Sequence, residues 1–121
     1  MFRAVEAAQE LGLELVQHGV EGRAVHQAIL QSLKEAGFDT ARRDGCMEGF
    51  VHTAGHGVGL DLQEAPHLSA TSRDVIRAGQ VLTLEPGLYY PDIGGVRLED
   101  VALVSRQGAR NLTKAEKSLE L

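Results

Sequence analysis

Apolar residues recur at steps of three or four along the first third of the chain. This spacing predicts an amphipathic helix from Phe2 to about His18, with Gly19 as its stop. A second helix is predicted from about Gly22 to Ala36, and Gly37 just past its end suits a left-handed cap. The stripe of the first helix is Phe2, Val5, Ala8, Gly12 and Leu15, and that of the second is Val25, Ile29 and Leu33.

After Phe38 the pattern changes to short apolar runs separated by glycines, which favours strands and tight turns. Residues 50–66 carry glycines at 55, 57 and 59, a spacing that disfavours a helix and permits close backbone approach. Val81–Leu84 reads as a strand ended by Glu85 and Pro86. Residues 94–105 are predicted as one strand, followed by a turn at Gly108.

On that last strand, a period of two puts Glu99 on one face with Arg97, Val101 and Leu103. Its apolar neighbours favour a buried carboxylate, which needs a cation or a hydrogen-bond donor as its partner.

Composition limits the classes of protein that fit. The 121 residues suit a single domain over 1–121, and no apolar run approaches the roughly 20 residues of a membrane-spanning helix. The net charge of -5 argues against a nucleic-acid partner. Cys46 is the only cysteine, so an intrachain disulfide is excluded. We therefore expect a cytoplasmic protein with no membrane and no nucleic-acid partner.

Imidazole and carboxylate groups stand out in the glycine-rich half, and together they suit divalent transition metals: His52, His56, Glu85 and Glu99. The glycines around the two histidines, and the lack of a Glu after His52, exclude the helical zinc-protease motif. Leu60 breaks the spacing of a dinucleotide-binding loop. A serine or cysteine nucleophile with a histidine base stays open, although no G-x-S-x-G turn occurs.

Three segments in order resemble the motifs of the pita-bread metallopeptidases: FVHTAGHGVGLDLQEAP, TLEPGLYY and GGVRLEDVALV. The opening AVEAAQE and the closing GARNLT are also similar, so the resemblance covers essentially the whole chain. It implies an α+β fold, a partial pita-bread in which two N-terminal amphipathic helices pack on a mainly antiparallel curved sheet. Arg97, two residues before the last glutamate, is typical of the Xaa-Pro dipeptidase and aminopeptidase branch, whereas methionine aminopeptidases usually carry Gln there.

The resemblance also implies the roles of individual residues. His56 becomes a metal ligand, Glu85 a ligand of the same metal and a catalytic proton shuttle, and Glu99 the bridge between two metals. His52 and Arg97 become catalytic residues that also contact the substrate, a peptide with proline in second position. The cofactor of the family is a divalent metal (Mn, Co or Zn), with two ions in the full site.

Two departures from the family pattern limit these expectations. The family supplies two aspartate ligands upstream of the matched region, so we expect a C-terminal portion of a catalytic domain that holds at most one metal well. Gln63, a substrate-binding candidate, stands seven residues after His56 where the family commonly has histidine. Activity of the isolated chain is therefore expected to be impaired, with a homodimer or larger homo-oligomer covering the exposed sheet edge. A non-catalytic peptide- or protein-binding module and a metal-independent hydrolase of the creatinase type remain as alternatives.

Overall fold

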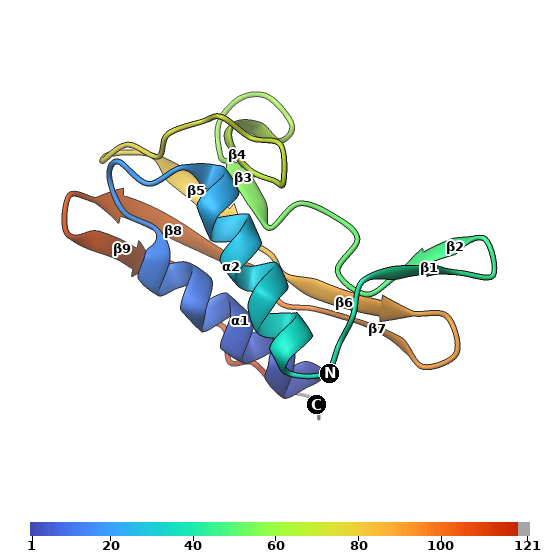
Figure 1. The fold of residues 1–121 in the computed structure, drawn as a ribbon. Coiled ribbons are helices and arrows are strands. Elements are labelled where there is room, and N and C mark those ends of the chain that lie inside the picture. Colours follow the sequence, from blue (N-terminus) through green and yellow to red (C-terminus); the bar gives the residue numbers. More distant parts are fainter. Residues whose placement is uncertain (119–121) are drawn as a thin grey trace.

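The computed structural model describes residues 1–118 of the chain. Helices come first in that part of the chain and strands follow (Figure 1). The helices are α1 (Phe2–Leu15) and α2 (Gly22–Glu35). The strands are β1 (Ala41–Arg43), β2 (Cys46–Glu48), β3 (Gly55–Gly57), β4 (Glu64–Leu68), β5 (Val81–Leu84), β6 (Gly87–Tyr90), β7 (Gly94–Arg97), β8 (Asp100–Ser105) and β9 (Gly108–Asn111).

Both predicted helices form, and their apolar stripes face the core. The stripe of α2 is fully buried, and Gly37 after it has the left-handed φ of 90°. The first helix is shorter than predicted, because Val16 already has an extended backbone. The reason is tertiary: two residues further on, the amide of His18 donates to the carbonyl of Ser105 at 3.2 Å, which draws the chain toward the end of β8.

The main sheet has five antiparallel strands in the order β4-β3-β5-β8-β9, and two separate hairpins are formed by β1–β2 and by β6–β7. The helices contact each other and pack on one side of the strands, α1 against β5, β7 and β9 and α2 against β4 (Figure 1). The observed fold is thus α+β with two helices on antiparallel sheets, as predicted. Within residues 1–118, no helix has the length and apolarity needed to cross a membrane.

The single strand predicted over residues 94–105 is wrong, because β7 and β8 are separated by Leu98 and Glu99. The partner segment is interrupted at the same level, between β5 and β6. Pro86 explains this interruption, since it has no backbone N–H to donate to a ladder. The register is unchanged across the break, because Leu84 pairs with Asp100 before it and Gly87 with Arg97 after it.

Continuing that register through the break places Glu85 directly opposite Glu99, at the one level where the ladder is open. Both carboxylates therefore leave the two segments at the same point, although they are far apart in sequence. The register thus determines where these two carboxylates meet.

Glu99 directly precedes β8 and does not share the buried face of that strand, which corrects the expectation of a buried carboxylate. Asp100, Ala102 and Val104 are buried, and the Glu99 side chain is 44% exposed. The helices cover the opposite face, where the buried side chain of Gln9 in α1 donates to the carbonyl of Leu84 at 2.9 Å.

Candidate metal centre

The glycines of the histidine motif let β3 approach its neighbours closely. A Cβ atom on Gly55 would collide with the carbonyl of Thr83 in β5, and one on Gly57 would collide with the carbonyl of Ala65 in β4. The close backbone approach predicted from the sequence is therefore confirmed. It holds His56, which lies between the two glycines, against the end of β5.

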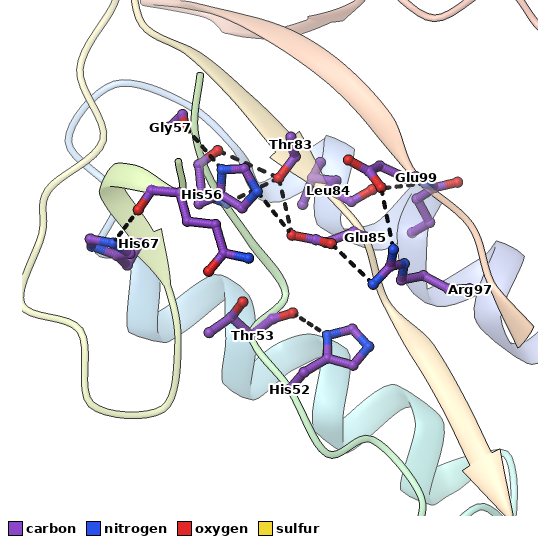
Figure 2. Close-up of polar contacts among 12 residues, drawn as sticks. His52, Thr53, His56, Gly57, His67, Thr83, Leu84, Glu85, Arg97 and Glu99 are labelled. Atoms are coloured by element: carbon purple, nitrogen blue, oxygen red, sulfur yellow. Dashed lines mark hydrogen bonds and ion pairs between the residues drawn. The ribbon is translucent and has the colours of Figure 1, made fainter. Parts of the chain in front are cut away.

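The imidazole of His56 is oriented by its neighbours toward Glu85 (Figure 2). Its Nδ1 lies 2.9 Å from the carbonyl of Gly57, an acceptor, so Nδ1 carries the proton and donates. Its Nε2 lies 3.3 Å from Oε1 of Glu85. A histidine that donates through one nitrogen to a backbone carbonyl and presents the other is arranged like a metal ligand.

Glu85 is only 6% exposed, and a second polar side chain holds its carboxylate. The hydroxyl of Thr83 accepts from the amide of His56 at 3.1 Å and donates to Oε1 of Glu85 at 3.4 Å. Thr83 lies two residues before Glu85 on the same strand, so both side chains leave the same face. The hydroxyl thereby ties the histidine segment to the glutamate.

Arg97 lies between the two carboxylates that the open ladder brings together (Figure 2). Its Nη1 is 3.7 Å from Oε2 of Glu85, and its Nη2 is 4.0 Å from Oε2 of Glu99. His56 and Arg97 approach the carboxylate of Glu85 from opposite sides. The guanidinium thus screens two like charges from each other.

The imidazole and carboxylate groups here are of the types that bind divalent cations, and two of them already lie close enough together to do so. One imidazole and two carboxylates converge on the break in the ladder, and His56 with Glu85 already forms a two-donor corner. Over the described range 1–118, however, no three His, Cys, Asp or Glu side chains stand ready together to hold a metal. Glu99 reaches the corner only through Arg97, so joining the donor set requires it to exchange that contact for the cation. The assignment of all three as ligands stays a prediction.

His52 lies beside this group and is fixed by two hydrogen bonds. Its Nδ1 is 2.7 Å from the carbonyl of Thr53 and therefore donates, so its Nε2 accepts from the hydroxyl of Tyr89 at 3.0 Å. The Tyr89 ring also meets the imidazole at a centroid distance of 5.3 Å. Sequence reasoning missed both Tyr89 and Thr83. The signal for Thr83 was its position two residues from Glu85, whereas nothing local pointed from Tyr89 to His52.

A buried histidine backs this region. His26 in α2 is 7% exposed and stacks on the ring of Phe50 at 5.0 Å, and Phe50 in turn meets His52 at 5.4 Å. Burial lowers the pKa of His26 below its ordinary value, which favours the neutral ring. A cavity of about 380 Å³ lies beside these rings, lined in part by His26, Phe50 and His52.

Gln63 is exposed in the turn before β4 and has a left-handed φ of 56°. Its carbonyl accepts from Nε2 of His67 at 2.8 Å, while Nδ1 of His67 lies 3.1 Å from Oδ2 of Asp74. A hydrogen bond from the amide of His67, together with the imidazole itself, lowers the pKa of Asp74. The substrate-binding role of Gln63 stays a prediction.

Known proteins resemble this chain over nearly its whole length. The Xaa-Pro dipeptidase of Pyrococcus furiosus is 35% identical over 119 residues, which is 98% of this chain and 32% of that protein. The solved prolidase of Pyrococcus horikoshii superposes with a TM-score of 0.84 at 36% identity, covering 98% of this chain and 32% of that one. The Xaa-Pro dipeptidase of Bacillus anthracis gives a TM-score of 0.85 at 36% identity, over 98% and 31%.

The chain thus spans about a third of the length of these relatives. Residues 1–106 match metallopeptidase family M24. A match over that much of the chain, together with the prolidase-like arrangement of helices and strands, shows that this chain belongs to metallopeptidase family M24.

Proposed function

We propose that this chain carries one side of the active site of a metal-dependent exopeptidase that hydrolyses the bond between an N-terminal residue and proline. The observation that carries the proposal is the convergence at the open ladder: His56 contacts Glu85 at 3.3 Å, and the register places Glu99 opposite Glu85. The Xaa-Pro dipeptidases among the relatives support the choice of substrate.

His56, Glu85 and Glu99 are the residues that would hold a divalent cation, and we propose Mn, Co or Zn. When bound, such a cation lowers the pKa of a water molecule and polarises the scissile carbonyl. The carboxylate of Glu85, sheltered from solvent, is placed to accept a proton and pass it to the leaving nitrogen. Arg97 holds Glu85 and Glu99 near each other before the cation binds. His52, whose tautomer is fixed by the hydrogen bond to Thr53, would contact the substrate through its ring.

The isolated chain is proposed to bind one cation and to hydrolyse peptides poorly. Two observations support this limit. Within residues 1–118 the structure has no ready three-donor group, and Gln63 cannot titrate as the family's usual histidine does. The same two observations favour a second candidate, a peptide-binding module that keeps the fold without the chemistry.

We also propose that copies of this chain associate through the loop that follows β3. Leu60 and Leu62 are 104% and 94% exposed, and Val58 beside them is 48% exposed. Strand β4, which follows this loop, is an edge strand of the main sheet. Exposed apolar side chains beside a free edge are a surface that association would cover. Light scattering at tens of micromolar protein, a rough working range for such contacts, should give more than the monomer mass, and a stable monomer contradicts this.

The proposed function is tested by metal analysis of purified wild-type chain and of His56→Ala, with cleavage of an Xaa-Pro dipeptide scored alongside. His18→Ala is the matched control, because His18 is exposed and outside the site. We expect metal in wild type and in the control and a loss of bound metal in His56→Ala. Equal metal in all three proteins removes the ligand assignment. Metal without cleavage in wild type supports the impaired metal site proposed for the isolated chain.

A further inference from the structure

Hairpins β1–β2 and β6–β7 touch at one point and then diverge (Figure 1). At that point Gly49 and Tyr89 exchange two backbone hydrogen bonds of 2.8 and 3.0 Å. The next hydrogen-bonded pair in the same register would be Met47 with Pro91. Pro91 has no N–H to donate, so the pairing stops and a gap opens, which we call the hairpin cleft.

One wall of the hairpin cleft offers unpaired main-chain groups. Hairpin β1–β2 turns through Asp44 and Gly45, both with positive φ, and Arg43 pairs with Cys46 across this turn. Hydrogen-bonded and open pairs alternate along an antiparallel ladder. Because the pair that closes a two-residue turn is hydrogen-bonded, the N–H and C=O of Met47 point away from β1 into the cleft. They form a short edge that an extended chain can pair with.

The hairpin cleft is hollowed on both faces. One cavity of about 480 Å³ is lined by Cys46 and Glu48, and another of about 250 Å³ is lined by Met47. Alternate residues of β2 point to opposite faces, which separates the two cavities, while Tyr90 and Pro91 line both. An inserted strand sends its own side chains alternately to the same two faces. This arrangement suits an extended peptide and not a helix.

The hairpin cleft leads into the proposed substrate site. Tyr89 lines the smaller cavity and donates its hydroxyl proton to His52 at 3.0 Å. Met47 lines both that cavity and the one of about 380 Å³ that contains His52. A peptide whose N-terminal residues lie beside His52 therefore has a continuous path along Met47.

We propose that the hairpin cleft binds the part of a peptide substrate that follows the Xaa-Pro pair, so that the chain selects oligopeptides over dipeptides. This inference rests on the proposed function, because the path starts at the proposed substrate site. The larger cavity also sets a preference of charge. Arg43 there is paired with Glu48 at 2.7 Å, whereas Asp44 and Asp92 make no ion pair with any residue of the described part. A lysine or arginine side chain on that face is favoured.

The test is a length series of peptides, Ala-Pro, Ala-Pro-Ala and Ala-Pro-Ala-Lys-Ala-Ala, titrated into the chain by calorimetry with chelator present so that no cleavage occurs. We expect the hexapeptide to bind about tenfold more tightly than the dipeptide, from two main-chain hydrogen bonds. Met47→Pro removes the free N–H without touching the bonds between β1 and β2, and it should bring the hexapeptide to within about threefold of the dipeptide. Met47→Leu, the control, should keep the full length dependence.

A second variant, at the surface, tests the hairpin cleft independently of whether Met47→Pro folds. Asp92→Lys should weaken the lysine-containing hexapeptide and strengthen its Lys→Glu counterpart, each by about two- to fivefold. The proposal is overturned if wild type binds peptides of all lengths with equal affinity. It is also overturned if Met47→Pro keeps the wild-type length dependence and Asp92→Lys keeps the wild-type charge preference. Metal bound through His56 with no length dependence overturns the hairpin cleft alone. A length dependence with no metal loss in His56→Ala supports the hairpin cleft and removes the assignment of His56 as a metal ligand.

Discussion

Replacing Gly55 by alanine should displace the histidine motif, because the new methyl group has no room. Its Cβ would lie on the backbone carbonyl of Thr83, in the neighbouring strand β5. A backbone carbonyl within a sheet cannot swing aside as a side chain can. The strands must therefore separate, and the contact between His56 and Glu85, which crosses the same pair of strands, must lengthen.

The expected cost follows from two opposing effects. Overpacking of this kind destabilises by about 1–3 kcal/mol, and the rigid backbone here places Gly55→Ala at the upper end. Alanine also lowers the conformational entropy of the unfolded chain, which offsets roughly 0.4–1 kcal/mol of this destabilisation. The net loss is about 2 kcal/mol, which at this length corresponds to a fall in Tm of about 8 °C.

Gly59→Ala is the matched control within the same glycine run. Its Cβ would meet the carboxylate of Glu64, the flexible end of a side chain, which can move away. We expect a change of no more than about 0.5 kcal/mol, typical of a surface substitution. Thermal unfolding followed by circular dichroism measures both variants. Equal Tm values for Gly55→Ala and Gly59→Ala would refute the claim that close strand approach at Gly55 positions the motif.

Three further outcomes follow from the structure. Burial lowers the pKa of the His26 imidazole below 6.5, so as the pH falls the unfolded chain protonates this ring before the folded chain does. The free energy of unfolding should therefore decrease as the pH drops below about 6.5. Urea titrations at pH 7.5 and 5.5 should show a smaller decrease for His26→Leu than for wild type. Lys117 contacts the buried carboxylate of Asp100 at 2.8 Å, so Lys117→Met leaves that carboxylate without its cation. The free energy of unfolding, measured by chemical denaturation, should fall by about 3 kcal/mol. Lys114→Met, on the exposed tail, should leave it almost unchanged. Leu60→Ser should lower the mass seen by light scattering at a fixed concentration, since it removes apolar surface from the proposed contact.

The helices were predictable because their signal is local. The stripe of Val25, Ile29 and Leu33 repeats within one segment and has a single reading, a buried helix face. The break between β7 and β8 was not predictable from residues 94–105, because its cause lies in the partner segment, at Pro86. The exposure of Glu99 was misjudged for a similar reason. Which face of β8 is buried depends on where α1 packs, and the alternation of residues does not contain that information.

The candidate site divides in the same way. The motifs pointed to His56, Glu85 and Glu99, and their convergence depends on a strand register that only the fold supplies. The supporting contacts of Thr83 and Tyr89 were missed, since each joins segments remote in sequence. These contacts fix the imidazole orientations on which any ligand or substrate role depends.

Convergence of His56, Glu85 and Glu99 on one cation is tested most directly by a crystal structure of the chain grown with Zn²⁺, with anomalous difference maps calculated at the zinc absorption edge. We expect one strong peak at the break in the ladder, about 2.0–2.2 Å from Nε2 of His56 and from carboxylate oxygens of Glu85 and Glu99. Arg97 should then have moved away from Glu99. A map with no peak there, or with zinc bound only elsewhere while Arg97 keeps both carboxylates, would contradict this convergence.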